Sequence, residues 1–173
     1  PNHIVRYLFD LLVHTMDVAW QNCLAALAIF AGPNWSMEAA QAVISAVLTS
    51  VPAATDEPLR SDAIFHYVVQ YRLVQQVAYG SNGARYALQP FVRSACARLL
   101  TDRTVITDRA GHAMAAHFAT VALTKRRPAD RDALRMEYVN CEAGLQWAHA
   151  HHEGELVVAY TVGLARFWQR EGL

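Results

Sequence analysis

Residues 84–100, ARYALQPFVRSACARLL, decide how this chain folds. Short extended runs at 73–79 and 85–88 flank the turn Gly80-Ser81-Asn82-Gly83, a composition typical of a β-hairpin. Pro90 then opens a helix, because proline is tolerated in the first helical turn. Apolar residues recur at helical spacing from Val92 to Leu100. The stretch and the run before it therefore predict a strand, a turn, a second strand and a helix.

Helices are expected before the hairpin, because apolar residues there recur on one face at helical spacing. Asp17 and Ser36 stand where N-caps are needed, and Gly32-Pro33 ends the helix between them. Helices followed by a hairpin and a last helix form a winged-helix domain, which we expect over residues 1–102. The expected helices cover Ile4–Thr15, Asp17–Ala31, Ser36–Leu48 and Leu59–Arg72, with a loop at Ser50–Pro58.

The remainder, residues 103–173, is expected to be helical throughout. Thr101–Thr107 is interpreted as a connector, and Lys125-Arg126-Arg127-Pro128 is expected to stop the next helix. Apolar stripes then run over 134–148 and 156–167. The predicted fold class is therefore mainly α, with one small β-hairpin in a winged-helix domain and an antiparallel helical region after it.

Composition restricts the class of protein. Hydrophobic residues make up 54% of the 173 residues, charged residues 17%, and the formal net charge is zero. This composition argues against disorder and against a general attraction to nucleic acid. Three separated cysteines on apolar stripes indicate reduced core thiols, and no segment has the character of a membrane span or a signal peptide. We expect a cytoplasmic fragment of a longer polypeptide, without a membrane partner.

Catalytic and cofactor motifs are absent from the sequence. It contains neither G-x-x-x-x-G-K-[ST] nor G-x-G-x-x-G nor G-x-S-x-G. His149 and His152 share a helix face, but no further ligand stands nearby, and histidines at a helix C-terminus favourably oppose the helix dipole. His117 is interpreted as a core histidine. We therefore predict a non-enzyme with no cofactor, no catalytic residue and no metal ligand.

Several stretches together resemble one protein family. The chain is similar to the winged-helix domain that follows the nucleotide-binding module in STAND-class signalling ATPases of the NB-ARC type, which include bacterial regulators of the AfsR and MalT kind. The helix at 137–148 is similar to the family's E-x-x-N-x-x-x-x-L-x-W-A helix, and the end of the chain to the start of a tetratricopeptide-type array. The stretches that carry the resemblance are Leu24–Gly32, Ser36–Ala40, Tyr86–Arg93, Glu137–Ala148 and Ala165–Trp168.

The resemblance implies a function without catalysis. The chain would transmit changes of conformational state between an upstream nucleotide-binding module of the same polypeptide and a helical sensor array. In the family a histidine often reaches the nucleotide phosphate where this chain has Gln89, which carries no titratable charge. Arg93 matches a family arginine, with an expected role as a salt bridge or carbonyl cap. The expected inter-domain and regulatory residues are Gln89, Arg93, His112, Glu137 and Asn140.

The apolar faces of the helical region are expected to need further packing partners. A single pair of helices cannot bury its apolar stripes alone, so more helical repeats or self-association should follow. Small residues such as Gly144 and Gly163 allow the helices to approach closely. Phe167 and Trp168 are predicted to form an exposed partner surface near the end of the chain.

Two other functions stay open from the sequence. A DNA-binding winged-helix regulator with a helical dimerisation or ligand domain would place Leu59–Arg72 in the major groove, yet this segment offers chiefly His66 and Gln70 as readers. DNA is therefore the less favoured partner. A small-molecule site between the domains, lined by Trp35, Tyr67 and Trp147, is the third hypothesis.

Overall fold

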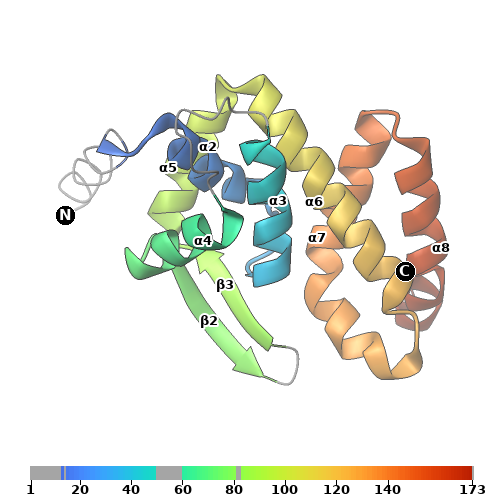
Figure 1. Ribbon diagram of the computed structural model, residues 1–173. Coiled ribbons are helices and arrows are strands. Elements are labelled where there is room, and N and C mark those ends of the chain that lie inside the picture. Colours follow the sequence, from blue (N-terminus) through green and yellow to red (C-terminus); the bar gives the residue numbers. More distant parts are fainter. Residues whose placement is uncertain (1–12, 14, 50–59, 81–82, 173) are drawn as a thin grey trace.

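The computed structural model describes residues 13, 15–49, 60–80 and 83–172 (Figure 1). This part of the chain is mainly helical with one small antiparallel sheet, which confirms the predicted fold class at that level. The predicted helix at Ile4–Thr15 and the loop at Ser50–Pro58 fall largely or wholly outside the described residues. The elements are α2 (Val18–Ala26), η1 (Leu27–Ile29), β1 (Trp35–Ser36), α3 (Met37–Leu48), α4 (Ser61–Gln70), β2 (Val74–Gly80), β3 (Gly83–Leu88), α5 (Pro90–Thr101), α6 (Thr104–Thr124), η2 (Pro128–Asp130), α7 (Arg131–Ala150) and α8 (Gly154–Glu171).

The sheet has three strands in the order β1-β3-β2. The β2–β3 hairpin pairs Val74 with Leu88 and Gly80 with Gly83, whose positive φ of 88° suits glycine. The third strand was not expected: β1 pairs Trp35 with Tyr86 on the other edge of β3. A strand of two residues is too short to show a period of two in the sequence.

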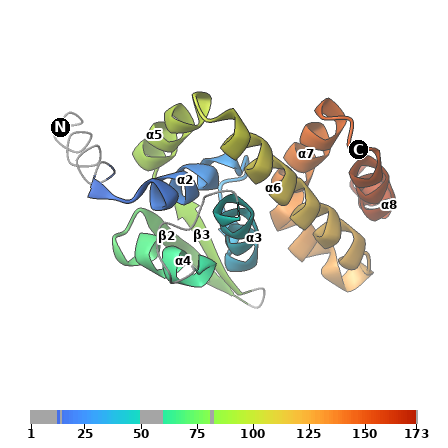
Figure 2. The ribbon, with the colours of Figure 1, turned by 45° about the horizontal axis from the view of Figure 1, so that its top comes forward.

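Helices α2, α3, α4 and α5 pack together beside the sheet and build the first part of the core (Figures 1 and 2). Helix α3 begins where expected, because the Ser36 hydroxyl accepts a hydrogen bond from the Ala39 amide at 3.2 Å. Trp35 and Phe30 are completely buried, with ring centroids 5.2 Å apart. The strand β1 and the loop before it are therefore anchored from the inside.

Helix α6 joins the two halves of the molecule (Figure 2). It packs against α3 on one side and against α7 and α8 on the other. The connector predicted at Thr101–Thr107 is wrong, since α6 already begins at Thr104. The Thr107 hydroxyl donates to the Leu100 carbonyl at 3.1 Å, and this hydrogen bond closes a turn of only two residues. One cluster of buried apolar side chains extends through both halves.

Helices α6, α7 and α8 form a three-helix bundle in which consecutive helices are antiparallel and small residues allow close approach. A Cβ atom on Gly163 would lie 2.7 Å from the Ala122 carbonyl carbon of α6. A Cβ atom on Gly144 would lie 2.0 Å from the Tyr160 hydroxyl, which donates to the Ala115 carbonyl at 2.6 Å. Within the described helices, none is both long and apolar enough to cross a bilayer.

The expected exposure of Phe167 is wrong. Its side chain is only 7% exposed, and its ring lies 5.1 Å from that of Tyr138 on α7. Trp168 is half-buried and its indole N–H donates to the Tyr138 hydroxyl at 3.3 Å. The reason is that α8 folds back on α7. Helix α7 thereby covers the aromatic side chains at the end of the apolar face of α8. The exposed apolar side chains of α8 are instead Val158 and Val162.

Candidate functional site

Polar side chains from three elements meet at the loop that joins η1 to β1. Arg85 comes from β3, Arg93 from α5, and Glu137 and Asn140 come from α7. All four make hydrogen bonds to this loop or to one another. We call this group, together with Gly32 and Asn34 of the loop, the polar junction.

Arg85 and Glu137 form the centre of the polar junction. Both guanidinium Nη atoms donate to the carboxylate, Nη1 to Oε1 and Nη2 to Oε2, the second at 3.0 Å. The two side chains are 5% and 7% exposed. Arg85 Nε donates to the Asn34 side-chain oxygen at 2.9 Å, and Nη2 also reaches the Asn34 carbonyl at 3.3 Å. Two buried charges are tolerated here because they neutralise each other in a paired geometry.

Asn140 fixes the loop to α7. Its side-chain oxygen accepts from the Gly32 amide at 2.8 Å, and its side-chain NH₂ group donates to the Asn34 carbonyl at 3.1 Å. A Cβ atom on Gly32 would lie 2.8 Å from the Asn140 amide group, so glycine provides the necessary space. The three-residue spacing from Glu137 puts both side chains on one face of α7.

Arg93 holds the same loop from the side of α5. Its Nη1 donates to the Phe30 carbonyl at 2.5 Å and its Nη2 to the Gly32 carbonyl at 3.1 Å. These oxygens belong to backbone groups that leave the 3-10 turn without a regular partner. Burial lowers the pKa of Arg93 from its usual value.

His117 of α6 lies within the electrostatic reach of the polar junction. Burial lowers the pKa of its imidazole, while the charges of Glu137 and Glu38 oppose that change. Glu38 lies in the first turn of α3, and a hydrogen bond to its own backbone amide lowers the pKa of its carboxyl, with a smaller contribution from Arg85. The junction therefore holds two guanidinium groups and one carboxylate, with Glu38 and a histidine that prefers to be neutral at its margin.

The structure brings together three of the five residues expected at the domain boundary. Arg93, Glu137 and Asn140 share the polar junction. Gln89 lies apart, donating to the Arg72 carbonyl at 3.0 Å beside the hairpin. The exposed ring of His112 packs edge-on against Trp147 at 5.8 Å.

Sequence reasoning missed Arg85, Asn34 and Gly32. Arg85 carried a usable signal, since it is the one charged residue in the strand predicted at 85–88. A charged side chain in a strand that pairs on both edges needs a buried partner. The acidic partner is 52 residues further along the chain, and its position follows only from the packing of α7.

Other candidate groups are engaged in the core or lie apart. Burial raises the pKa of the Cys23, Cys96 and Cys141 thiols to about 12 each. In the described ranges no group of three or more His, Cys, Asp and Glu side chains is placed to hold a metal ion. Trp35 is fully buried, whereas Tyr67 packs on Trp20 of α2 at 4.7 Å. The aromatic side chains predicted to line one ligand site therefore lie in separate places.

The polar junction is complete in its hydrogen bonding. Over the described residues, the one buried side-chain nitrogen or oxygen without a hydrogen-bond partner is Trp35 Nε1, which is outside the junction. Comparisons with protein-family models, with curated proteins and with solved structures found no match to the chain. The role of the polar junction must therefore be argued from its geometry.

Proposed function

We propose that this chain is a non-catalytic regulatory part of a STAND-type signalling ATPase or transcriptional regulator. A winged-helix domain at residues 1–102 relays the state of an upstream nucleotide-binding module to a tetratricopeptide-like array that begins at residue 103. The observation that carries this proposal is the buried Arg85–Glu137 ion pair, which joins the hairpin to α7.

A buried ion pair makes a joint that resists sliding. Apolar side chains can shift past one another at modest cost, but a two-pronged Arg–carboxylate contact depends on distance and orientation. Asn140 adds two hydrogen bonds from α7 to the loop, and Arg93 adds two from α5. A displacement of the hairpin side must therefore move α7 or break buried polar contacts, which is the behaviour that a relay requires.

Two further features support the proposal. Helices before the hairpin and α5 after it follow the order expected of a winged-helix domain. Helices α6, α7 and α8 pack closely through Gly144 and Gly163, as helical repeats do. The polar groups of the junction bond within the protein, and the three cysteine thiols are buried with raised pKa values, which favours a packing role over catalysis.

Hydrogen exchange tests the relay directly. Asn140→Ala removes the two hydrogen bonds between α7 and the loop. We expect faster amide exchange in α7 and in the loop, and also in residues 83–88, to which Asn140 makes no hydrogen bond. Glu142→Gln is the matched control, because Glu142 is exposed on the same helix. If faster exchange stays within α7 and the loop and does not reach residues 83–88, the hairpin is not coupled to α7 and the relay is wrong. The assignment to a signalling ATPase further requires a P-loop in the preceding part of the full polypeptide.

The alternative, a DNA-binding winged-helix regulator with a helical dimerisation domain, has weaker support. Arg60 at the start of α4 is paired with Asp62 at 2.9 Å, which removes positive charge from the helix that would enter the groove. A salt-dependent mobility shift of duplex DNA at sub-micromolar protein would favour this alternative over the relay.

A further inference from the structure

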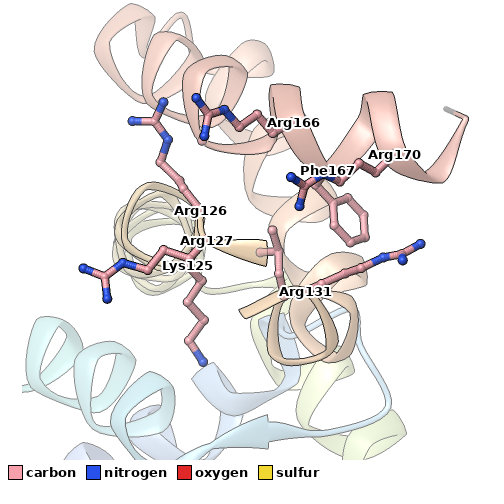
Figure 3. Close-up of a pocket in the computed structure, with 9 residues that line it drawn as sticks. Lys125, Arg126, Arg127, Arg131, Arg166, Phe167 and Arg170 are labelled. Atoms are coloured by element: carbon pink, nitrogen blue, oxygen red, sulfur yellow. The ribbon is translucent and has the colours of Figure 1, made fainter. Parts of the chain in front are cut away.

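A hollow lined with basic side chains lies at the far end of the helical region from α5 (Figure 3). The basic residues come from the end of α6, the start of α7 and the last part of α8. Leu134, Gly163 and Phe167 form its apolar lining. We call it the basic hollow; its six basic residues are Lys125, Arg126, Arg127, Arg131, Arg166 and Arg170.

The positive charge of the basic hollow is poorly compensated. Arg131 donates to Glu171 at 2.6 Å, and that carboxylate is shared with Arg135. For the other five basic residues, the described structure contains no ion pair, and none of the described lining residues is acidic. The formal net charge of the whole chain is zero, so positive charge is concentrated here at the expense of other surfaces.

Helix dipoles explain only part of this concentration. The C-termini of α6 and α8 each present about half a negative charge, and the N-terminus of α7 presents about half a positive one. Their sum offsets less than one of the unpaired cations. Arg166, moreover, lies before the last turn of α8, where the dipole is weak. The remaining positive charge therefore favours binding of an anion from outside the described chain.

The shape of the basic hollow indicates the size of that anion. The hollow is partly open and its volume is about 20 Å³, enough for one water-sized group. Figure 3 shows that the charged ends fan out around the hollow, with Lys125 directed away from Arg166. A single oxyanion cannot reach all of them. An anion with several charged groups can seat one oxygen atom in the hollow and place its other charged groups on the rim.

The residue types favour phosphate. Five of the six basic residues are arginines, whose planar forks donate two parallel hydrogen bonds to phosphate oxygens. Proteins that bind a nucleic-acid backbone usually carry a stripe of cations along one face and a net positive charge. Here the basic residues lie around one hollow, with the Lys125 amine directed away from it, in a chain of zero net charge. A small soluble ligand fits these observations better than a nucleic acid.

We propose that the basic hollow binds a small soluble anion carrying two or more phosphate groups. This site is separate from the polar junction: none of its lining residues belongs to the junction. The proposal therefore does not depend on the relay, and the two are tested by different variants.

Calorimetric titration with sodium tripolyphosphate in a phosphate-free buffer tests the site. We expect saturable binding of about one ion per chain, weaker at higher salt because screening shortens the range of the attraction. Arg166→Ala with Arg170→Ala, on the exposed face of α8, should weaken binding by about tenfold or more. Arg126→Ala with Arg127→Ala tests the α6 side independently. Arg98→Ala is the control, since it removes one charge from an exposed position on α5.

Specific results would overturn the proposal. These are no binding of tripolyphosphate at millimolar concentration, or equal affinity in the control and in both double variants with native circular dichroism. Citrate binding as tightly as tripolyphosphate would show a general anion site without preference for phosphate. Duplex DNA binding more tightly than tripolyphosphate, with the same loss in the double variants, would assign the surface to nucleic acid instead.

Discussion

The guanidinium of Arg85 and the carboxylate of Glu137 are 52 residues apart in the sequence and form a buried two-pronged ion pair. Arg85 belongs to the central strand of the sheet, and Glu137 lies on a helix of the C-terminal half. The pair sets the angle at which α7 meets the hairpin. It also needs both partners, because either charge alone would be buried without compensation.

Removing one partner of this pair should destabilise the protein strongly. We expect Glu137→Ala to lower the free energy of unfolding by about 3–5 kcal/mol, since it leaves the Arg85 charge buried and unpaired. Urea unfolding followed by circular dichroism measures this loss. Replacing both partners with apolar residues, Arg85→Met with Glu137→Leu, should recover most of it, because no charge then remains buried. A double variant as unstable as the single one would contradict this account.

The contact between α6 and α8 should be sensitive to a single methyl group. Gly163→Ala places its Cβ 2.7 Å from the Ala122 backbone, which cannot rotate away. We expect the overpacked variant to lose about 1–3 kcal/mol of stability in thermal or urea unfolding. Gly154→Ala at the start of α8 is the control, since its Cβ would have no atom within 4 Å. Equal stability of the two variants would show that α8 shifts freely on α6.

Local patterns predicted most of the secondary structure. The stripe from Val92 to Leu100 gave α5, and the Gly-rich turn gave the hairpin, because both signals reside in neighbouring residues. Strand β1 was missed, since two residues carry no periodicity and Trp35–Ser36 is extended only through its pairing with β3. The segment at 104–107 was assigned to a connector because it lacks a clear apolar stripe, yet α6 begins there.

The polar junction was predictable only in part. Glu137 and Asn140 share a helix face at a spacing visible in the sequence, but the partner of each depends on how α7 packs. The same limit explains why the burial of Phe167 was not predicted. Its place on an apolar stripe was evident, whereas the ring of Tyr138 that covers it comes from another helix. Contacts between distant segments depend on the whole fold, and periodicity does not encode them.

Acid should destabilise the protein partly through His117. Burial lowers the pKa of this histidine in the folded state below its usual value of 6.5, so the unfolded state binds the proton more readily. The stabilisation that the neutral imidazole contributes is therefore present above pH 6.5, and it decreases as the pH falls from 6.5 toward the pKa of the folded state. We expect His117→Gln to lose less stability than the natural protein between about pH 7.5 and pH 5.5, measured by urea unfolding. Equal losses would exclude this contribution.

The cysteines should be unreactive in the folded protein. Burial raises the pKa of the Cys23, Cys96 and Cys141 thiols to about 12, so almost no thiolate is present near pH 8. We expect no alkylation by iodoacetamide under native conditions and modification of all three in urea, counted by mass spectrometry. Rapid native labelling of any one would locate a part of the core that opens readily.

Charge reversal at Arg93 should loosen the loop at the polar junction. Arg93→Glu removes two hydrogen bonds, and it places a carboxylate beside the carbonyl oxygens of Phe30 and Gly32. We expect a loss of about 3 kcal/mol in urea unfolding, since each charge-assisted hydrogen bond contributes about 1.5–3 kcal/mol. Arg98→Glu makes the same charge change at an exposed position of α5, where the arginine reaches only the Ser94 carbonyl at 3.4 Å. Because both variants change the net charge equally, a difference between them reports the loss of the two carbonyl contacts together with the repulsion between the new carboxylate and these oxygens. Equal losses would mean that Arg93 does not hold the loop.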